Sequence, residues 1–257
     1  MESQLNKEYN SQGGRYSDYI TQLPLAPLET ELFQTALGDC TGLTVLDLGG
    51  GSGLKAREAI DRGAVAVDVV DLSSEMMRVG QEVEKSLGRH EAGVISWNTG
   101  DIAQSLTHLP LRPSYDLVLV GWTFDHAHNL AEYEGMWRNA AAYLKPGGRL
   151  VSVRVGDIRG AAWDGRYGNV SSAIQEMADG LEYRYALLMD PPVEFEASSL
   201  YISMTGNTEL PEKYGFTSFS SVLPEDTSVV KADPEFWKPF IENPGFVVFH
   251  AKKISDV

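Results

Sequence analysis

The chain has 257 residues and a formal net charge of −15, from 21 Lys and Arg against 36 Asp and Glu; so acidic a surface disfavours nucleic-acid and anionic-membrane partners. Its single cysteine, Cys40, excludes an internal disulfide and a multi-cysteine zinc site. Met1–Gly14 lacks the apolar segment of a signal peptide, and no apolar run reaches the about 18 residues that span a bilayer, so we expect a soluble, cytoplasmic protein.

Short apolar runs alternate with helical patterns across residues 43–155. The runs that we interpret as strands are Thr44–Leu48, Val65–Val70, Gly93–Trp97, Tyr115–Val120 and Arg149–Val155. Helices are expected around Ala59 and Ile60, after a cap at Ser73 or Ser74, and from about Leu130 to Leu144, where Lys145-Pro146-Gly147-Gly148 ends the pattern. This alternation predicts a doubly wound α/β fold with a mostly parallel sheet.

The remainder of the chain departs from this alternation. Leu181–Met189 and Glu194–Met204 have strand patterns and are joined through Asp190-Pro191-Pro192, which predicts a late β-hairpin. Phe216–Leu223 and Phe246–Ala251 predict two further strands. By analogy between folds, we expect the hairpin to cover a substrate site, and the first forty residues to add helices across the carboxyl ends of the strands.

A glycine-rich loop, Gly49–Gly53, follows the first predicted strand. In open α/β sheets, ligands bind beyond the carboxyl ends of the strands, and glycines let the backbone turn sharply and approach a ligand closely. The helix that comes next presents free N–H groups and a partial positive charge. The loop therefore predicts a nucleotide-like cofactor site, and the alternative is a glycine-rich turn without a ligand.

Two details of this loop discriminate between cofactors. The dinucleotide fingerprint G-x-G-x-x-G fails because Leu54 occupies the place of the third glycine, and no Gly-Lys-Ser/Thr is present after it to make a phosphate-binding loop. Asp47 stands just before the glycines, where a pyrophosphate would come close. A carboxylate at that position suits a cofactor with a cationic head.

Two further acids lie after the second and third predicted strands. Asp71 ends the second strand, where a carboxylate can accept hydrogen bonds from both hydroxyls of a ribose. Its alternative role is the N-cap of the next helix. Asp101 comes after the third strand with Ile102 beside it, and this pair can flank an adenine. A helix cap explains Asp101 equally well.

Together these motifs resemble a class I S-adenosylmethionine-dependent methyltransferase over roughly residues 9–155. The resemblance rests on Val45–Gly53, Val70–Met76, Gly100–Ile102, Tyr115–Val118 and Leu144–Gly148, in that order and spacing. The tail, with Asp233–Trp237 and Glu242–Pro244, further resembles small-molecule methyltransferases of fungal and actinobacterial secondary metabolism. The family implies S-adenosylmethionine as cofactor. It also implies a Rossmann-like sheet with a seventh, antiparallel strand, which Phe246–Ala251 could supply.

The resemblance also implies roles for individual residues. Asp47 lies near the ammonium group of the cofactor, and Gly49 and Gly51 pass close to its methionine part. The other cofactor-binding residues that it implies are Asp71 at the ribose hydroxyls, Leu72 and Met76 beside the adenosine, Asp101 and Ile102 at the adenine, Gly121 and Trp122 near the sulfonium, and Tyr16, which with Tyr9 matches paired tyrosines that close over the cofactor. Gly13-Gly14 departs from the helical sequence usual between these tyrosines and predicts a mobile N-terminal lid.

Because no linker or repeat divides the chain, residues 1–257 are expected to form one domain. Its parts are an N-terminal helical lid (1–40), a cofactor-binding core (41–155), a substrate cap (156–215) and C-terminal strands (216–257). The cap region contains the aromatic residues Trp163, Tyr167, Tyr183, Tyr185 and Tyr201. They either wall a flat or terpenoid-like substrate or fill the core beneath the hairpin.

Methyl transfer from a sulfonium requires an aligned nucleophile, and an oxygen acceptor also requires a base. His126 lies after the fourth strand, where the family places catalytic groups, and an imidazole with an ordinary pKa of about 6.5 suits a base. Its alternative role, like that of His128, is an ordinary loop residue. Asp125 could instead meet a cationic substrate. No metal is expected, because the Asp125-His126-x-His128 spacing lacks a further ligand.

Three functions fit these residues. The leading prediction is methyl transfer to an oxygen, nitrogen or carbon atom of a small molecule, without a nucleic-acid or membrane partner. The alternative is a cyclase or pericyclase that retains the cofactor as a fixed cation. The intact glycines, Asp71 and Asp101 disfavour a non-catalytic subunit. The sequence defines neither the acceptor nor the oligomeric state.

Overall fold

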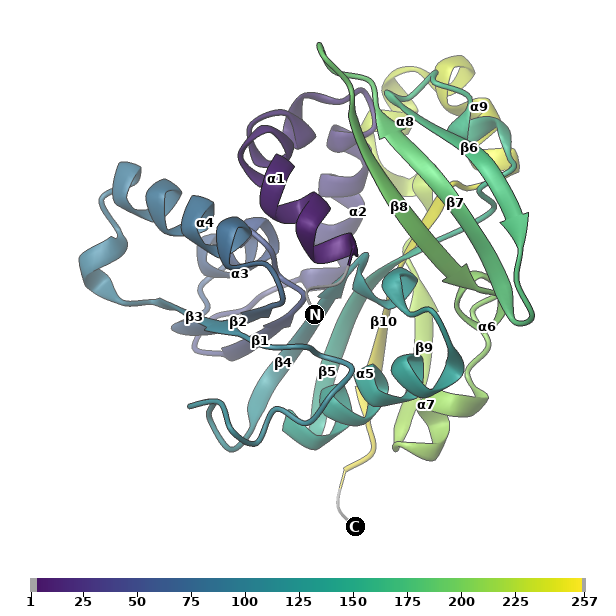
Figure 1. Ribbon diagram of the computed structural model, residues 1–257. Coiled ribbons are helices and arrows are strands. Elements are labelled where there is room, and N and C mark those ends of the chain that lie inside the picture. Colours follow the sequence, from purple (N-terminus) through teal and green to yellow (C-terminus); the bar gives the residue numbers. More distant parts are fainter. Residues whose placement is uncertain (1–3, 256–257) are drawn as a thin grey trace.

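The computed structural model describes residues 4–255, and a seven-stranded sheet lies at its centre (Figure 1). The strands are arranged in the order β3-β2-β1-β4-β5-β10-β9. Their bounds are β1 (Thr44–Leu48), β2 (Ala66–Asp71), β3 (Ile95–Thr99), β4 (Tyr115–Gly121), β5 (Leu144–Val155), β9 (Phe216–Ser221) and β10 (Phe246–Lys253). Strands β1 to β5 pair in parallel, whereas β10 is antiparallel to both β5 and β9. The expected Rossmann-like sheet with one antiparallel strand is confirmed.

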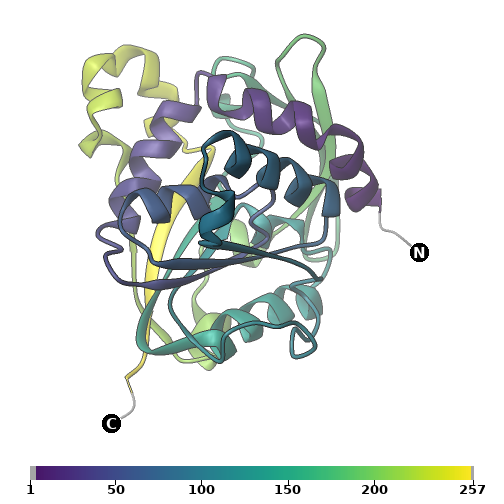
Figure 2. The same ribbon diagram turned by 90° about the vertical axis from the view of Figure 1, so that its left-hand side faces the viewer.

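Helices cover both faces of this sheet (Figures 1 and 2). Their bounds are α1 (Gln4–Tyr19), α2 (Ala26–Leu37), α3 (Leu54–Asp61), α4 (Ser74–Ser86), α5 (Leu130–Tyr143), α6 (Tyr201–Met204), α7 (Glu209–Lys213), α8 (Ser228–Ala232) and α9 (Pro234–Glu242). Neighbouring side chains of β1 lie on opposite faces of the sheet: Val45 packs in the core that α2 and α3 share, and Leu46 packs in the core that contains α5. Burial on both faces explains why the strands are apolar almost throughout. None of the described helices is long and apolar enough to cross a membrane.

Two element ends illustrate how local sequence determines the fold. Ser73 caps α4, because its hydroxyl oxygen accepts a hydrogen bond from the Met76 N–H. α5 ends at Tyr143, but the Lys145–Gly148 segment that we expected to separate it from the next strand belongs to β5. That strand begins at Leu144 and pairs with β4 through a register shift.

An antiparallel sheet of three strands forms the cap: β6 (Asn169–Glu176), β7 (Gly180–Leu187) and β8 (Val193–Leu200). The sequence predicted the β7–β8 hairpin but missed β6. This strand is largely polar and exposed, its Ala173 has a φ of 52°, and its pairing with β7 shifts register beyond Ser172. The second expected strand is also too long, because the chain turns into α6 after Leu200.

Helix α1 lies across the carboxyl ends of the strands and packs against α4 (Figure 2). It continues through Gly13-Gly14 without a break, and the mobility of this lid stays a prediction. Gly13 is buried, and a Cβ at this position would lie 2.7 Å from Met76 Sδ. The glycine therefore allows a close approach of the two helices.

Candidate functional site

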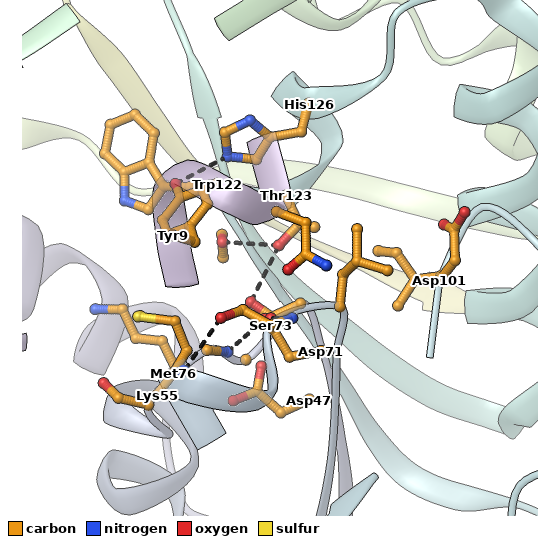
Figure 3. A pocket seen from close by; sticks show the side chains of 18 of the residues that line it. Tyr9, Asp47, Lys55, Asp71, Ser73, Met76, Asp101, Trp122, Thr123 and His126 are labelled. Carbon is orange, nitrogen blue, oxygen red and sulfur yellow. Dashed lines mark hydrogen bonds between the residues drawn. The ribbon is translucent and has the colours of Figure 1, made fainter. Parts of the chain in front are cut away.

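A cavity of about 300 Å³ lies beneath α1 at the carboxyl ends of the strands (Figure 3). It sits where the strand order reverses between β1 and β4, which is the usual ligand position in such sheets. The structure brings every candidate site residue into its lining: Tyr16, Asp47, Gly49, Gly51, Asp71, Leu72, Met76, Asp101, Ile102, Gly121, Trp122 and His126. Tyr9 lines it as well.

The glycine loop leaves room for a ligand only because it carries no side chains. Gly49 has a φ of 72°, and a Cβ there would lie 2.2 Å from Thr123 Oγ1. The Thr123 hydroxyl lies 3.2 Å from the Leu48 carbonyl oxygen and 3.4 Å from that of Gly49, and these contacts hold the segment after β4 against the loop. Gly51 also has a positive φ, of 53°. Both positions require the left-handed conformation that glycine adopts without strain.

Asp47, at the end of β1, is a buried carboxylate without a hydrogen-bond partner in the described chain. Its side chain is 1% exposed, and neither oxygen is paired. Burial and the negative charge of Asp71 raise the pKa of Asp47 to about 7, although the positive charge of Lys55 acts in the opposite direction. A buried, unpaired carboxyl of this kind is costly unless a ligand supplies a positive charge. The residue therefore fits a cofactor with an ammonium group.

Asp71, at the end of β2, holds the glycine loop and the start of α4 together. Its Oδ2 accepts a hydrogen bond from the Gly51 N–H at 2.8 Å, and its Oδ1 accepts one from the Ser73 N–H at 2.8 Å. Burial raises its pKa, although these backbone hydrogen bonds act in the opposite direction. Because Ser73 caps α4, the alternative N-cap role of Asp71 is wrong. Each carboxylate oxygen keeps a lone pair for a ribose hydroxyl.

Asp101 and Ile102 come after β3 at the mouth of the cavity (Figure 3 labels Asp101). The Asp101 side chain is exposed, and its Oδ1 accepts a hydrogen bond from the Ala103 N–H at 2.9 Å within a turn. No helix begins there in the described chain, so the helix-cap alternative is wrong. Ile102 and Met76 are buried, and with the exposed Leu72 they line an apolar part of the cavity.

Sequence reasoning missed a buried charge cluster at this cavity. Lys55 Nζ lies 3.1 Å from Glu29 and 3.0 Å from Glu58, above the ring of Phe33. Burial alone would lower the pKa of Lys55, but the two carboxylates raise it. Trp122 Nε1 donates to Glu29, so the cluster connects α2, α3 and the segment after β4. The sequence feature that could have indicated this cluster is Lys55 itself, because a lysine in the first turn of a helix is disfavoured by the helix dipole.

His126 lies at the opposite end of the view in Figure 3 from Asp47. Its Nε2 is 3.3 Å from the Tyr9 hydroxyl, which is in turn 3.2 Å from the Tyr185 hydroxyl, while its Nδ1 has no partner in the described chain. Burial, and to a smaller extent the nearby His128, lowers the pKa of His126 to about 4. The expected ordinary pKa is therefore wrong, and the imidazole is neutral at pH 7.

A second cavity, of about 80 Å³, lies beneath the cap. Six residues line both cavities and form a partition between the two: Tyr9, Tyr16, Ile20, Glu29, Trp122 and His126. Of the aromatic residues noted in the sequence, Trp163, Tyr183 and Tyr185 line it. The others do not: Tyr167 stacks on Trp237 in the core, and Tyr201 is exposed and donates to Glu176.

Asp125 also lines the second cavity, but its carboxylate is already engaged. Oδ2 accepts a hydrogen bond from the Val155 N–H at 2.7 Å, and Oδ1 accepts one from the Ser203 hydroxyl at 3.1 Å. Burial raises the pKa of Asp125 to about 6. His128 is exposed, with Nδ1 3.1 Å from the Ser198 hydroxyl. Within residues 4–255, no three His, Cys, Asp or Glu side chains are grouped to hold a metal ion.

Comparison with known families identifies the core of this fold. Residues 45–148, which include the glycine loop and all three strand-end acids, match the family described as a methyltransferase domain. This part of the chain is similar to a methyltransferase domain. The unpaired Asp47 carboxylate and the glycine cradle fit S-adenosylmethionine, the cofactor of this domain. No curated protein matches the sequence.

Solved structures share the fold of this methyltransferase domain at low identity. An S-adenosylmethionine-dependent methyltransferase from Mesorhizobium loti is 21% identical, with 90% of this chain and 98% of that chain covered and a TM-score of 0.55. The 1,6-didemethyltoxoflavin-N1-methyltransferase of Burkholderia thailandensis is 17% identical, with 98% and 88% covered and a TM-score of 0.56. The [4+2]-cyclase SpnF is 15% identical, with 90% and 82% covered and a TM-score of 0.55.

Proposed function

We propose that this chain transfers a methyl group from S-adenosylmethionine to a small secondary metabolite that is held beneath the cap. The observation that supports this most directly is the second cavity, which adjoins the cofactor cavity across Tyr9, Trp122 and His126. Bound S-adenosylmethionine supplies an activated methyl group on a sulfonium. A methyltransferase of similar fold, solved with 1,6-didemethyltoxoflavin bound, supports a small-molecule acceptor.

The cofactor-binding roles are assigned from charge and position. Asp47 faces the ammonium group, because its unpaired carboxyl requires a cation. Asp71 accepts the ribose hydroxyls with its remaining lone pairs. The other proposed contacts are Gly49 and Gly51 at the methionine part, Leu72, Met76, Asp101 and Ile102 around the adenine, Gly121 and Trp122 near the sulfonium, and Tyr16 above the cofactor.

The residues of the partition align the acceptor and exclude water, which is most of what an in-line displacement requires. His126 is the catalytic candidate, because it lines both cavities and its Nδ1 is unpaired. Moving a proton from a phenol-like hydroxyl to an imidazole of pKa about 4 is uphill by about six pH units. We therefore assign His126 the role of a hydrogen-bond acceptor that orients the acceptor group, and not that of a strong base.

The second candidate function is cyclisation without methyl transfer. It is supported by the similar fold of SpnF and by the same arrangement of two adjoining cavities, in which a retained cofactor could act as a fixed cation. The two functions differ in whether the methyl group leaves the cofactor.

Incubation with methyl-tritiated S-adenosylmethionine and a low-molecular-weight cell extract tests the proposal. We expect tritium in a small molecule with the wild type and with Glu75→Gln, a partly exposed helix acid paired with Arg78, but a strongly reduced yield with Asp71→Asn. An unlabelled isomerised product would support cyclisation. Failure of S-adenosylmethionine to raise the melting temperature would overturn both functions.

A further inference from the structure

The buried charge cluster at the first cavity carries more negative than positive charge. Lys55, which is labelled in Figure 3, has its Nζ 3.1 Å from Glu29 Oε1 and 3.0 Å from Glu58 Oε1. No other lysine or arginine of the described chain lies within ion-pair distance of either carboxylate. One ammonium group shared by two carboxylates leaves a negative charge uncompensated. A buried charge in this state costs free energy unless a ligand supplies the counter-charge.

Only one of the two carboxylates is placed to receive such a ligand. Glu58 lines neither cavity, and its unpaired Oε2 is enclosed by protein. Glu29 lines both cavities, and its side chain is 14% exposed. Its Oε1 accepts the Trp122 Nε1–H in addition to the Lys55 ammonium, which leaves Oε2 without a partner in the described chain. Unlike the free oxygen of Glu58, this oxygen keeps accessible surface.

The second cavity has a lining that favours a positive group. It includes the carboxylates of Glu29 and Asp125, but no lysine or arginine of the described chain. Arg154 favours the charged form of Asp125 from a distance, yet it does not line the cavity. The aromatic members of the lining are Tyr9, Tyr16, Trp122, Trp163, Tyr183 and Tyr185. The faces of such rings attract cations, most strongly where water is excluded.

Size and charge limit the group that enters this cavity. Its volume of about 80 Å³ is roughly half of the about 150 Å³ of a protein cavity that binds benzene. A small end of a metabolite fits, but not a whole metabolite. An anionic end would face two carboxylates, whereas the lysine of the cluster lines the first cavity alone.

We infer that the methyl acceptor carries a protonated amine, and that this ammonium group lies in the second cavity and donates a hydrogen bond to Glu29 Oε2. The inference rests on the proposed function, because it assigns this cavity to the acceptor. It makes Glu29 the residue that determines specificity for a cationic acceptor. A neutral analogue of the same shape leaves the negative charge of the cluster uncompensated and binds more weakly.

Isopropylammonium and isopropanol test this inference, because they are close in size and both donate hydrogen bonds, but only the amine is charged. Their affinities are measured by ligand-observed NMR on the full chain saturated with S-adenosylhomocysteine, in about 0.15 M salt to screen the acidic surface. We expect isopropylammonium to bind about tenfold more tightly, as for a hydrogen bond to a charged group. Equal affinities, or no binding of either probe, would overturn the inference.

A cavity-filling variant tests whether the amine binds in the second cavity. Ala197 is buried and lines this cavity but not the first, whereas Ala186 lines neither. We expect Ala197→Leu to abolish measurable binding of isopropylammonium and Ala186→Leu to keep the wild-type affinity. Undiminished binding by Ala197→Leu would place the amine elsewhere on the acidic chain and overturn the inference.

Glu29→Gln is the matched variant for the contact itself, because glutamine keeps an oxygen for Trp122 and removes only the charge. Its control is Glu58→Gln, which takes a carboxylate from the same lysine but from neither cavity. We expect Glu29→Gln to bring the two probe affinities close together without weakening isopropanol, whereas Glu58→Gln should still bind isopropylammonium more tightly.

A preference for the amine that survives in Glu29→Gln would refute the role of Glu29. If the affinity for S-adenosylhomocysteine fell in the same variant, Glu29 would belong to the cofactor site instead. The wild-type comparison of the two probes stands even if Glu29→Gln does not fold. Failure of the wild type to bind S-adenosylhomocysteine would refute the proposed function, which distinguishes that outcome from failure of this inference alone.

Discussion

Replacing Asp47 by asparagine should stabilise the cofactor-free protein at pH 8 and weaken its affinity for S-adenosylmethionine. The carboxyl group is 1% exposed and unpaired, and burial raises its pKa to about 7. A group whose pKa is higher in the folded state contributes most to stability at low pH. This contribution is lost as the pH rises from the unfolded-state pKa through about 7.

The size of this stability change is set by the difference between the pKa of Asp47 in the folded state and its pKa in the unfolded state. A folded-state pKa of about 7 against the ordinary 3.8 corresponds to roughly 4 kcal/mol of unfolding free energy above pH 7, at about 1.4 kcal/mol per pH unit. Asp47→Asn removes the charge, so the variant should gain up to about 4 kcal/mol over the wild type at pH 8. The gain should shrink towards pH 5. Urea denaturation at the two pH values measures it.

The same carboxylate must be ionised to pair with an ammonium group, so binding should release a proton below pH 7. Wild-type affinity should therefore fall by about tenfold for each pH unit below 7. Asp47→Asn should lose this dependence and bind roughly 10- to 100-fold more weakly at pH 8, as expected for a lost charge-assisted hydrogen bond. Isothermal titration calorimetry measures both effects.

Asp68→Asn is the control for this prediction, since Asp68 is equally buried but paired with Arg112 and Tyr115. It should destabilise the protein at pH 8, the opposite of Asp47→Asn. The reasoning is refuted if Asp47→Asn is less stable than the wild type at pH 8, or if it binds the cofactor as tightly.

Three further predictions concern the lid, the ribose site and the partition. Gly14→Ala should stabilise the protein by about 0.5–1 kcal/mol, since nothing lies within 4 Å of its added Cβ. Gly13→Ala should give no such gain, since its added Cβ would meet Met76. Thermal denaturation of both variants distinguishes these two outcomes. Asp71→Asn should weaken S-adenosylmethionine binding roughly 10- to 100-fold by calorimetry, and unchanged affinity would remove the ribose assignment. Single-turnover methyl transfer should show no His126 titration between pH 5.5 and 8, because the pKa of this imidazole is about 4; a limb near pH 6.5 that His126→Ala abolishes would contradict this.

The sheet and the cofactor cavity could be predicted because their signals are local in sequence. The apolar runs of β1 and β4 are buried on both faces, so their pattern predicts strands directly. Asp47, Asp71 and Asp101 each lie at or just beyond the end of a strand, and a parallel sheet brings such positions to one edge.

The cap and the partition could not be predicted, because they depend on contacts between distant segments. Tyr9 meets His126 and Tyr185 only after α1, the segment after β4 and the cap have assembled. The same packing buries His126 and lowers its pKa, which no local pattern indicates. Asn169 begins a polar strand whose sequence shows no clear alternation, so neither β6 nor its unpaired amide was foreseen.

The most direct test of two adjoining cavities with separate roles is to fill the second one. Ala197 is buried and lines that cavity but not the first, whereas Ala186, on the neighbouring strand, lines neither. Transfer of tritiated methyl into the low-molecular-weight extract is measured for Ala197→Leu, Ala186→Leu and the wild type, with the cofactor affinity of each. We predict that Ala197→Leu loses more than tenfold in transfer rate while its cofactor affinity stays within a few fold, and that Ala186→Leu resembles the wild type. Undiminished transfer by Ala197→Leu would contradict the account.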